Sequence, residues 1–76
     1  MTTKDQHILT FWWAKLHECE IAAEKPVSAG EVARYVGQSI GTAKRYLKRL
    51  VGEGGATASS VTFPNKVEGV VYATKS

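Results

Sequence analysis

One short run of the chain combines basic and apolar side chains at the spacing of a helix. The run is GTAKRYLKRLVGEG, residues 41–54, and its cations are Lys44, Arg45, Lys48 and Arg49. Its apolar residues are Ala43, Leu47, Leu50 and Val51. At 3.6 residues per turn, the apolar side chains fall on one side and the cations on the opposite side. Such a helix can bind a polyanion such as nucleic acid, or its basic face can simply be hydrated.

The distribution of charge along the chain favours binding of a polyanion. The whole chain carries a net charge of +3. Residues 26–54 alone carry +3, whereas residues 1–25 carry −1 and the remainder carries +1. A local concentration of charge attracts counter-charges even when the whole protein is only mildly basic. The middle segment is therefore the part expected to meet an anionic partner.

Length and composition predict a single domain over residues 1–76. With 76 residues and 43% hydrophobic content, the chain can form one small core but not two. It has no apolar run near the roughly 20 residues needed to cross a bilayer, and its N-terminus lacks the layout of a signal peptide. We therefore expect a cytoplasmic or nucleoid-associated protein with no membrane partner. One cysteine, Cys19, cannot form an internal disulfide.

The residues that could support catalysis or metal binding do not form a recognisable motif. His7, His17 and Cys19 are the only soft metal ligands, and positions 17 and 19 of one helix point in different directions. No Gly-rich phosphate loop, nucleophile elbow or catalytic carboxylate pair occurs, and Glu18 and Glu20 are best explained as a solvated face. We expect no enzyme activity, no metal and no cofactor, with both histidines on the surface and the cysteine in the core.

The N-terminal part of the chain has the pattern of a long amphipathic helix. Apolar residues recur there at intervals of three and four, and they are Ile8, Trp12, Leu16 and Cys19. This spacing predicts a helix over about residues 4–23. Lys25-Pro26 ends it, because the residue before a proline is pushed out of helical geometry. Only a very short extended piece fits before the next element.

Two further helices are predicted on either side of a tight turn. Ser28 and Glu31 have the spacing of a capping box, which predicts a helix over about residues 29–36. The turn at residues 37–39 begins with a glycine that can end this helix and finishes with a serine that can cap the next one. The next helix, over about residues 40–52, carries the basic run.

The C-terminal segment has no helical period and predicts a β-hairpin over about residues 56–74. It is rich in Thr, Val, Phe and Tyr, which are common in strands. Pro64-Asn65 and Gly69 indicate a loop around residues 64–69 between the two strands.

With these elements in order, the chain resembles a winged helix-turn-helix domain. The matching stretches are VSAGEVARYVGQSIGTAKRYLKRLVGEG and, as the wing, SSVTFPNKVEGVVYAT, so that the resemblance covers residues 3–74. It implies an α+β fold of three helices followed by a C-terminal β-hairpin wing. It also implies a small transcriptional regulator that binds double-stranded DNA sequence-specifically and acts by occupying its operator. Domains of this fold also bind RNA or proteins within larger assemblies, and that alternative stays open.

The resemblance also implies how DNA would be contacted. The helix over residues 40–52 would lie in the major groove, with the wing on the adjacent backbone or minor groove. Arg45 is the best candidate for base reading, because arginine can bond guanine bidentately. Lysines on the same face would meet phosphates, and the wing tip would add another phosphate contact. The candidate DNA-binding residues are Gln38, Ser39, Gly41, Thr42, Lys44, Arg45, Lys48, Arg49 and Lys66.

Three consecutive aromatics on the first helix raise the question of a partner protein. Trp12 is centred on the apolar stripe, whereas Phe11 and Trp13 lie about 100° to either side of it. One small core does not easily cover both flanking rings, so we expect one to be exposed and to form a homodimer interface through helix 1. The alternative is that all three rings pack within the domain. The chain has no room for an effector domain, so no small-molecule effector is expected.

Overall fold

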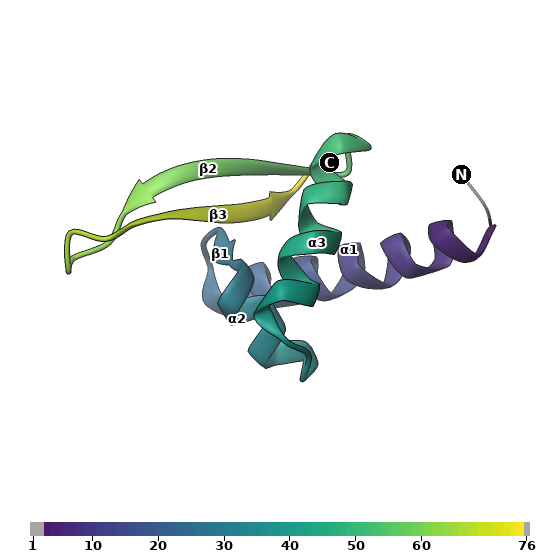
Figure 1. Cartoon of the computed structure of the whole chain (residues 1–76), viewed down its shortest axis with the longest axis horizontal. Helices are drawn as coiled ribbons and strands as arrows, with labels where there is room; N and C mark the ends of the chain where they lie inside the picture. Colours follow the sequence, from purple (N-terminus) through teal and green to yellow (C-terminus); the bar gives the residue numbers. More distant parts are fainter. Residues whose placement is uncertain (1–2, 76) are drawn as a thin grey trace.

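The computed structural model describes residues 3–75, which form three helices and a three-stranded antiparallel sheet (Figure 1). In chain order the elements are α1 (Thr3–Ala23), β1 (Val27–Ser28), α2 (Ala29–Val36), α3 (Ile40–Gly52), β2 (Ala56–Thr62) and β3 (Glu68–Thr74). The predicted α+β class is therefore confirmed, and the bounds of each predicted helix agree to within one residue. Figure 1 shows the hairpin of β2 and β3 projecting beyond the helices.

Helix α1 buries one apolar stripe and ends where the sequence indicates. Its buried residues are Leu9, Trp12, Leu16 and Cys19. Leu9 takes the core position expected for Ile8, which is only partly buried. The helix ends at Ala23, and Glu24 adopts a left-handed conformation with φ of 58°. The chain then reaches Pro26 and enters β1.

Side-chain caps begin α2 and α3 as predicted. The Ser28 hydroxyl accepts a hydrogen bond from the backbone N–H of Glu31 at 3.2 Å, and the Ser39 hydroxyl accepts one from the N–H of Thr42 at 3.2 Å. Gly37 ends α2 with φ of 82°, a left-handed conformation that glycine adopts without a steric penalty. The helix end at Gly37 and the cap at Ser39 thus fix the turn that joins α2 to α3.

The strands are ordered β1-β3-β2, so that the last strand of the chain lies in the middle of the sheet. Strand β1 has two residues and pairs antiparallel with β3. Strand β2 pairs with β3 at every position from Ala56↔Thr74 to Thr62↔Glu68 without a bulge. The short β1 therefore ties the hairpin to the start of α2.

The loop of the hairpin is shorter than the sequence indicates. It spans residues 63–67, because the N–H of Phe63 donates to the carbonyl of Val67 at 2.9 Å and the N–H of Lys66 donates to the carbonyl of Phe63 at 2.8 Å. Gly69 is not part of the loop but lies inside β3. A Cβ atom at Gly69 would overlap the Phe63 ring, so glycine there lets the ring lie across β3.

The core lies between the three helices and the inner face of the sheet. Its fully buried side chains are Leu16, Val27, Val32, Ala43 and Leu47. Each large apolar side chain buried in this way stabilises the fold by about 1.5–3 kcal/mol. Within residues 3–75, no helix combines the length and apolar character needed to cross a membrane.

Candidate nucleic-acid interface

Helix α3 separates an apolar face from a cationic one. Ala43, Leu47 and Leu50 are buried against the core. On the opposite side, Lys44, Arg45 and Lys48 are exposed, and Arg49 is half-buried toward one flank. The apolar and cationic sides of this helix that the sequence predicts are therefore the sides on which the structure places these side chains.

The cations of α3 have no carboxylate partner in the part of the chain that the structure describes. The two ion pairs there both lie on α1, between Lys15 and Glu18 at 3.6 Å and between His17 and Glu20 at 3.4 Å. Because no carboxylate among the described residues forms an ion pair with these cations, the exposed face of α3 presents a positive potential to solvent.

A groove separates the cationic face of α3 from the hairpin. Its volume is about 390 Å³, and Lys44 and Lys48 line it from α3. The hairpin side includes Phe63, Glu68 and Val70, and residues 28–30 line it at the start of α2. The groove thus has two cations on its helical wall and an aromatic ring with one carboxylate on its hairpin wall.

The tip of the hairpin presents Lys66 in an unusual backbone conformation. Lys66 has φ of 64°, in the left-handed region that glycine and asparagine usually occupy. Pro64 sits at the first corner of the turn, where its fixed φ fits, and the Asn65 side chain accepts a hydrogen bond from the Val67 N–H at 3.2 Å. These contacts hold the exposed lysine at the end of the hairpin.

The N-terminal end of α3 carries the remaining candidate residues. The Ser39 hydroxyl lies 2.8 Å from the Thr42 hydroxyl in addition to capping the helix, so both hydroxyls already have a partner in the protein. Gln38 is exposed at the turn. A Cβ atom at Gly41 would meet no other atom within 4 Å, so the helix surface there is open.

Gln38 and Thr42 lie on the flank of α3 that faces away from the hairpin. They line a second groove, of about 410 Å³, together with Tyr46 of α3 and aromatic residues of α1. Tyr46 is partly buried and stacks on Trp12 with ring centroids 5.3 Å apart, so it packs at the edge of the core. The candidate residues therefore divide between two flanks of one helix, with Arg45 on the exposed side between them.

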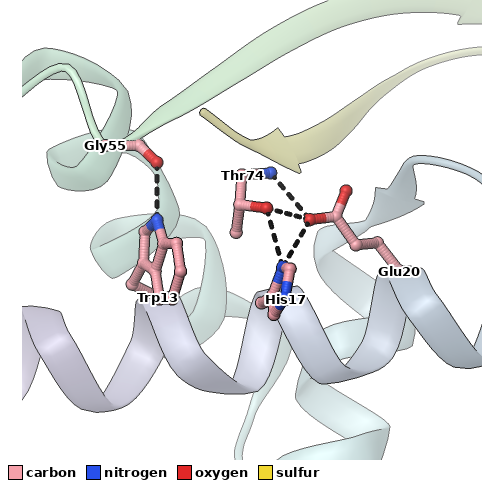
Figure 2. Close-up of polar contacts among 5 residues, drawn as sticks. All are labelled: Trp13, His17, Glu20, Gly55 and Thr74. Atoms are coloured by element: carbon pink, nitrogen blue, oxygen red, sulfur yellow. Dashed lines mark hydrogen bonds and ion pairs between the residues drawn. The ribbon is translucent and has the colours of Figure 1, made fainter. Parts of the chain in front are cut away.

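The base of the hairpin is fastened to α1 by a polar cluster that the sequence did not reveal (Figure 2). The Trp13 indole N–H donates to the carbonyl of Gly55 at 2.9 Å. Glu20 accepts hydrogen bonds from the backbone N–H of Thr74 at 3.1 Å and from the Thr74 hydroxyl. His17 lies 3.1 Å from that hydroxyl and stacks on Trp13. The two ends of the hairpin are thus held to one helix.

This cluster corrects one expectation from the sequence, the solvated position of Glu20. Glu20 was expected on a solvated face, but its side chain is only 17% exposed and accepts hydrogen bonds from Thr74. His17 lies on the surface as predicted, with its side chain 45% exposed, and it also contacts Thr74. Their spacing of three residues places them on one side of α1, and only the return of β3 to that side supplies their partner. No signal within the sequence of α1 indicates that return.

Of the two aromatics that flank Trp12, Phe11 is the exposed one. Its exposed fraction is 45%, its ring meets the Trp12 ring edge-on, and the Lys15 ammonium lies 5.7 Å from its centroid. Trp13 is half-buried against the base of the hairpin instead. Of the two aromatics considered for a homodimer interface on α1, only Phe11 is therefore exposed.

Chemistry-bearing side chains outside this interface are dispersed. Among the described residues, no group of three or more His, Cys, Asp or Glu side chains is placed to hold a metal ion. Cys19 is buried as predicted, and burial, followed by the nearby Glu31 carboxylate, raises the pKa of its thiol.

Comparison with protein-family models, curated proteins and solved structures finds no match for this chain.

Proposed function

We propose that this protein is a winged helix-turn-helix protein that binds double-stranded DNA with a sequence preference, and that it regulates transcription by occupying its operator. In this proposal α2 and α3 are the helix-turn-helix unit, α3 is the recognition helix, and the hairpin of β2 and β3 is the wing. Support comes from the element order, the capped helices around the turn at residues 37–39, and the return of the last strand to the centre of the sheet. The protein acts by binding and not by catalysis.

One observation carries the proposal: the exposed face of α3 bears cations with no internal partner among the described residues. Lys44, Arg45 and Lys48 project from one side of a helix whose other side is buried in the core. DNA offers a dense row of phosphates and a major groove about 12 Å wide, which admits a helix with its side chains. A helix fixed by its buried face can dock there without reorganisation of the core.

The contacts divide by position on the proposed interface. Arg45 lies on the exposed side of α3 and reads a base edge, because its planar guanidinium bonds guanine at two acceptors. Lys44 and Lys48 lie toward the groove beside the hairpin and contact phosphates. Lys66, at the tip of the wing, contacts the backbone of the adjacent segment. The lysines supply affinity, and the arginine supplies sequence preference.

The experiment that tests this function is an electrophoretic mobility shift at moderate salt. A preferred duplex is first selected from a random pool, and its complex is then challenged with unlabelled duplex DNA or double-stranded RNA. We expect the DNA competitor to displace the complex and the RNA to compete poorly. Equal competition by the RNA would support an RNA-binding module instead, and no shift of any duplex would support a protein-interaction module.

A pair of charge-matched variants makes this experiment specific for α3. The first variant replaces Lys44, Arg45 and Lys48 with alanine. The control variant replaces Lys4, Lys15 and Lys75 with alanine. Both variants lose the same formal charge, but only the first loses it from α3. We expect loss of the shifted band in the first and retention in the control; equal weakening in both would mean that net charge, and not this face, attracts the DNA.

A further inference from the structure

The outer edge of β2 is a free sheet edge. The sheet order is β1-β3-β2, so that β3 covers one side of β2 and no described strand covers the other. The strand has seven residues, and most of it is exposed. A strand of this length presents a row of backbone donors and acceptors that can accept another strand.

The hydrogen bonds at the two ends of the hairpin define which backbone groups face outward. The N–H of Phe63 bonds the carbonyl of Val67, and the N–H of Lys75 bonds the carbonyl of Gly55. Residues of an antiparallel pair alternate between bonded and non-bonded positions. Odd-numbered residues of β2 therefore bond β3. The outward-facing residues are Ala56, Ala58, Ser60 and Thr62.

These outward groups have no partner within residues 3–75, and the strand has no feature that would block pairing. No backbone or side-chain hydrogen bond joins the N–H or carbonyl of Ala58, Ser60 or Thr62 to any described residue outside the hairpin. The sequence ATASSVT contains no charge, proline or glycine, and the ladder has no bulge. Charges, prolines and bulges are the usual means of preventing edge-to-edge association.

We infer that β2 pairs antiparallel with β2 of a second copy of this chain and forms a continuous six-stranded sheet. An antiparallel pair of identical strands has a two-fold axis, so the donors and acceptors of one edge match those of the same edge. With the axis at Ser60, this residue faces its own counterpart, and Ala58 faces Thr62 of the second copy. Ser60 lies nearer to the loop than to the base of β2, and Figure 1 shows the loop end of the hairpin projecting beyond the helices.

The assembly closes at two copies. The opposite edge of the sheet consists of the two residues of β1 and of the part of β3 that β1 leaves uncovered toward the loop, residues 68–70, so it is interrupted and offers no strand of seven residues for a second such contact. An interface that uses one patch on both partners is isologous and does not extend into a filament. The two-fold axis is perpendicular to the sheet, so both three-helix layers lie on the same side. This inference holds whether or not α3 binds DNA.

Amide hydrogen exchange at several protein concentrations tests the pairing. In the dimer, the amides of Ala58, Ser60 and Thr62 become hydrogen-bonded, so their exchange should slow as concentration rises. The amides of Ser59 and Val61 bond β3 in every state and should be protected throughout. Fast exchange of the three outward amides at a concentration where sedimentation shows a dimer would overturn the proposal and favour another surface, such as Phe11. A monomer at millimolar concentration would overturn it as well.

A charge swap at the symmetry axis provides an independent test. Ser60→Lys places two like charges opposite each other in the dimer, and so does Ser60→Glu. We expect several-fold weaker self-association of each variant alone and recovery of dimer in an equal mixture of the two. The control is Ser59→Lys, which adds the same charge one position away and does not face itself. Unchanged association of both Ser60 variants would overturn the proposal.

Discussion

Replacement of Gly41 by alanine is expected to stabilise the fold while weakening DNA binding. Most substitutions in a binding site lower both quantities or leave stability unchanged, so opposite changes are informative. Gly41 lies in the first turn of α3 on its exposed side, and a Cβ atom there would meet nothing in the protein within 4 Å. The added methyl group would instead project toward the proposed DNA.

The size of each change follows from this position. Alanine is favoured over glycine by about 0.8–1.0 kcal/mol in a helix interior, and by less near an end, so we expect a gain of about 0.5–1 kcal/mol. In a domain of this length, that gain raises Tm by about 2–8 °C. If the methyl group holds α3 away from the base edges, the bidentate contact of Arg45 is weakened. Loss of such a contact costs about 1–3 kcal/mol, or about 5- to 160-fold in affinity.

Gly52→Ala is the matched control for this variant. Gly52 is the last residue of α3, and a Cβ atom there also meets nothing within 4 Å. The control should gain a similar stability without loss of affinity, because it lies at the end of α3 far from its N-terminal half. Thermal unfolding and titration of the selected duplex measure both quantities. Equal affinities of the two variants for DNA would refute close approach of α3 at Gly41.

Three further predictions concern packing, the wing tip and the thiol. Leu47→Ala should lower the free energy of unfolding by about 2–5 kcal/mol, while Lys48→Ala lowers it by almost none; equal losses in urea would contradict the observed orientation of α3. Lys66→Gly should leave that free energy unchanged or higher, because glycine relieves the left-handed strain, and a lower value would contradict this reasoning. Burial, followed by Glu31, raises the pKa of Cys19 above its ordinary value of 9.0, so native alkylation should be much slower than alkylation in urea at neutral pH. Because the thiol ionises first in the unfolded chain, its contribution to the free energy of unfolding is fully present below pH 9.0 and is lost as pH rises further. Equal alkylation rates in the two states would argue against burial of the thiol.

Local signals account for the parts of the fold that the sequence predicted well. A serine before α2, a serine before α3 and a glycine between them fix the helix ends through contacts within a few residues. The cationic face of α3 was predictable for the same reason, since helical geometry alone separates Lys44, Arg45 and Lys48 from Leu47.

The features that the sequence did not predict depend on contacts between distant residues. Trp13 bonds Gly55 and Glu20 bonds Thr74, and each pair is separated by more than forty positions. Neither pairing leaves a periodic pattern in α1. Gly69 suggested a turn, but its role depends on the Phe63 ring that lies across β3. The position of the groove beside α3 therefore required the structure.

The most direct test of DNA binding through α3 is the dependence of affinity on salt for single-charge variants. For Lys44→Ala, Lys48→Ala and Lys66→Ala, each lost phosphate contact should reduce the slope of log affinity against log salt by about 0.9, with little change in sequence preference. Arg45→Ala should instead reduce the ratio of affinities for preferred and scrambled duplexes. Lys15→Ala, on α1, should retain the wild-type slope and ratio. If all four interface variants also retain the wild-type slope and ratio, the cationic face of α3 is only a hydrated surface and the proposed mode of DNA binding is wrong.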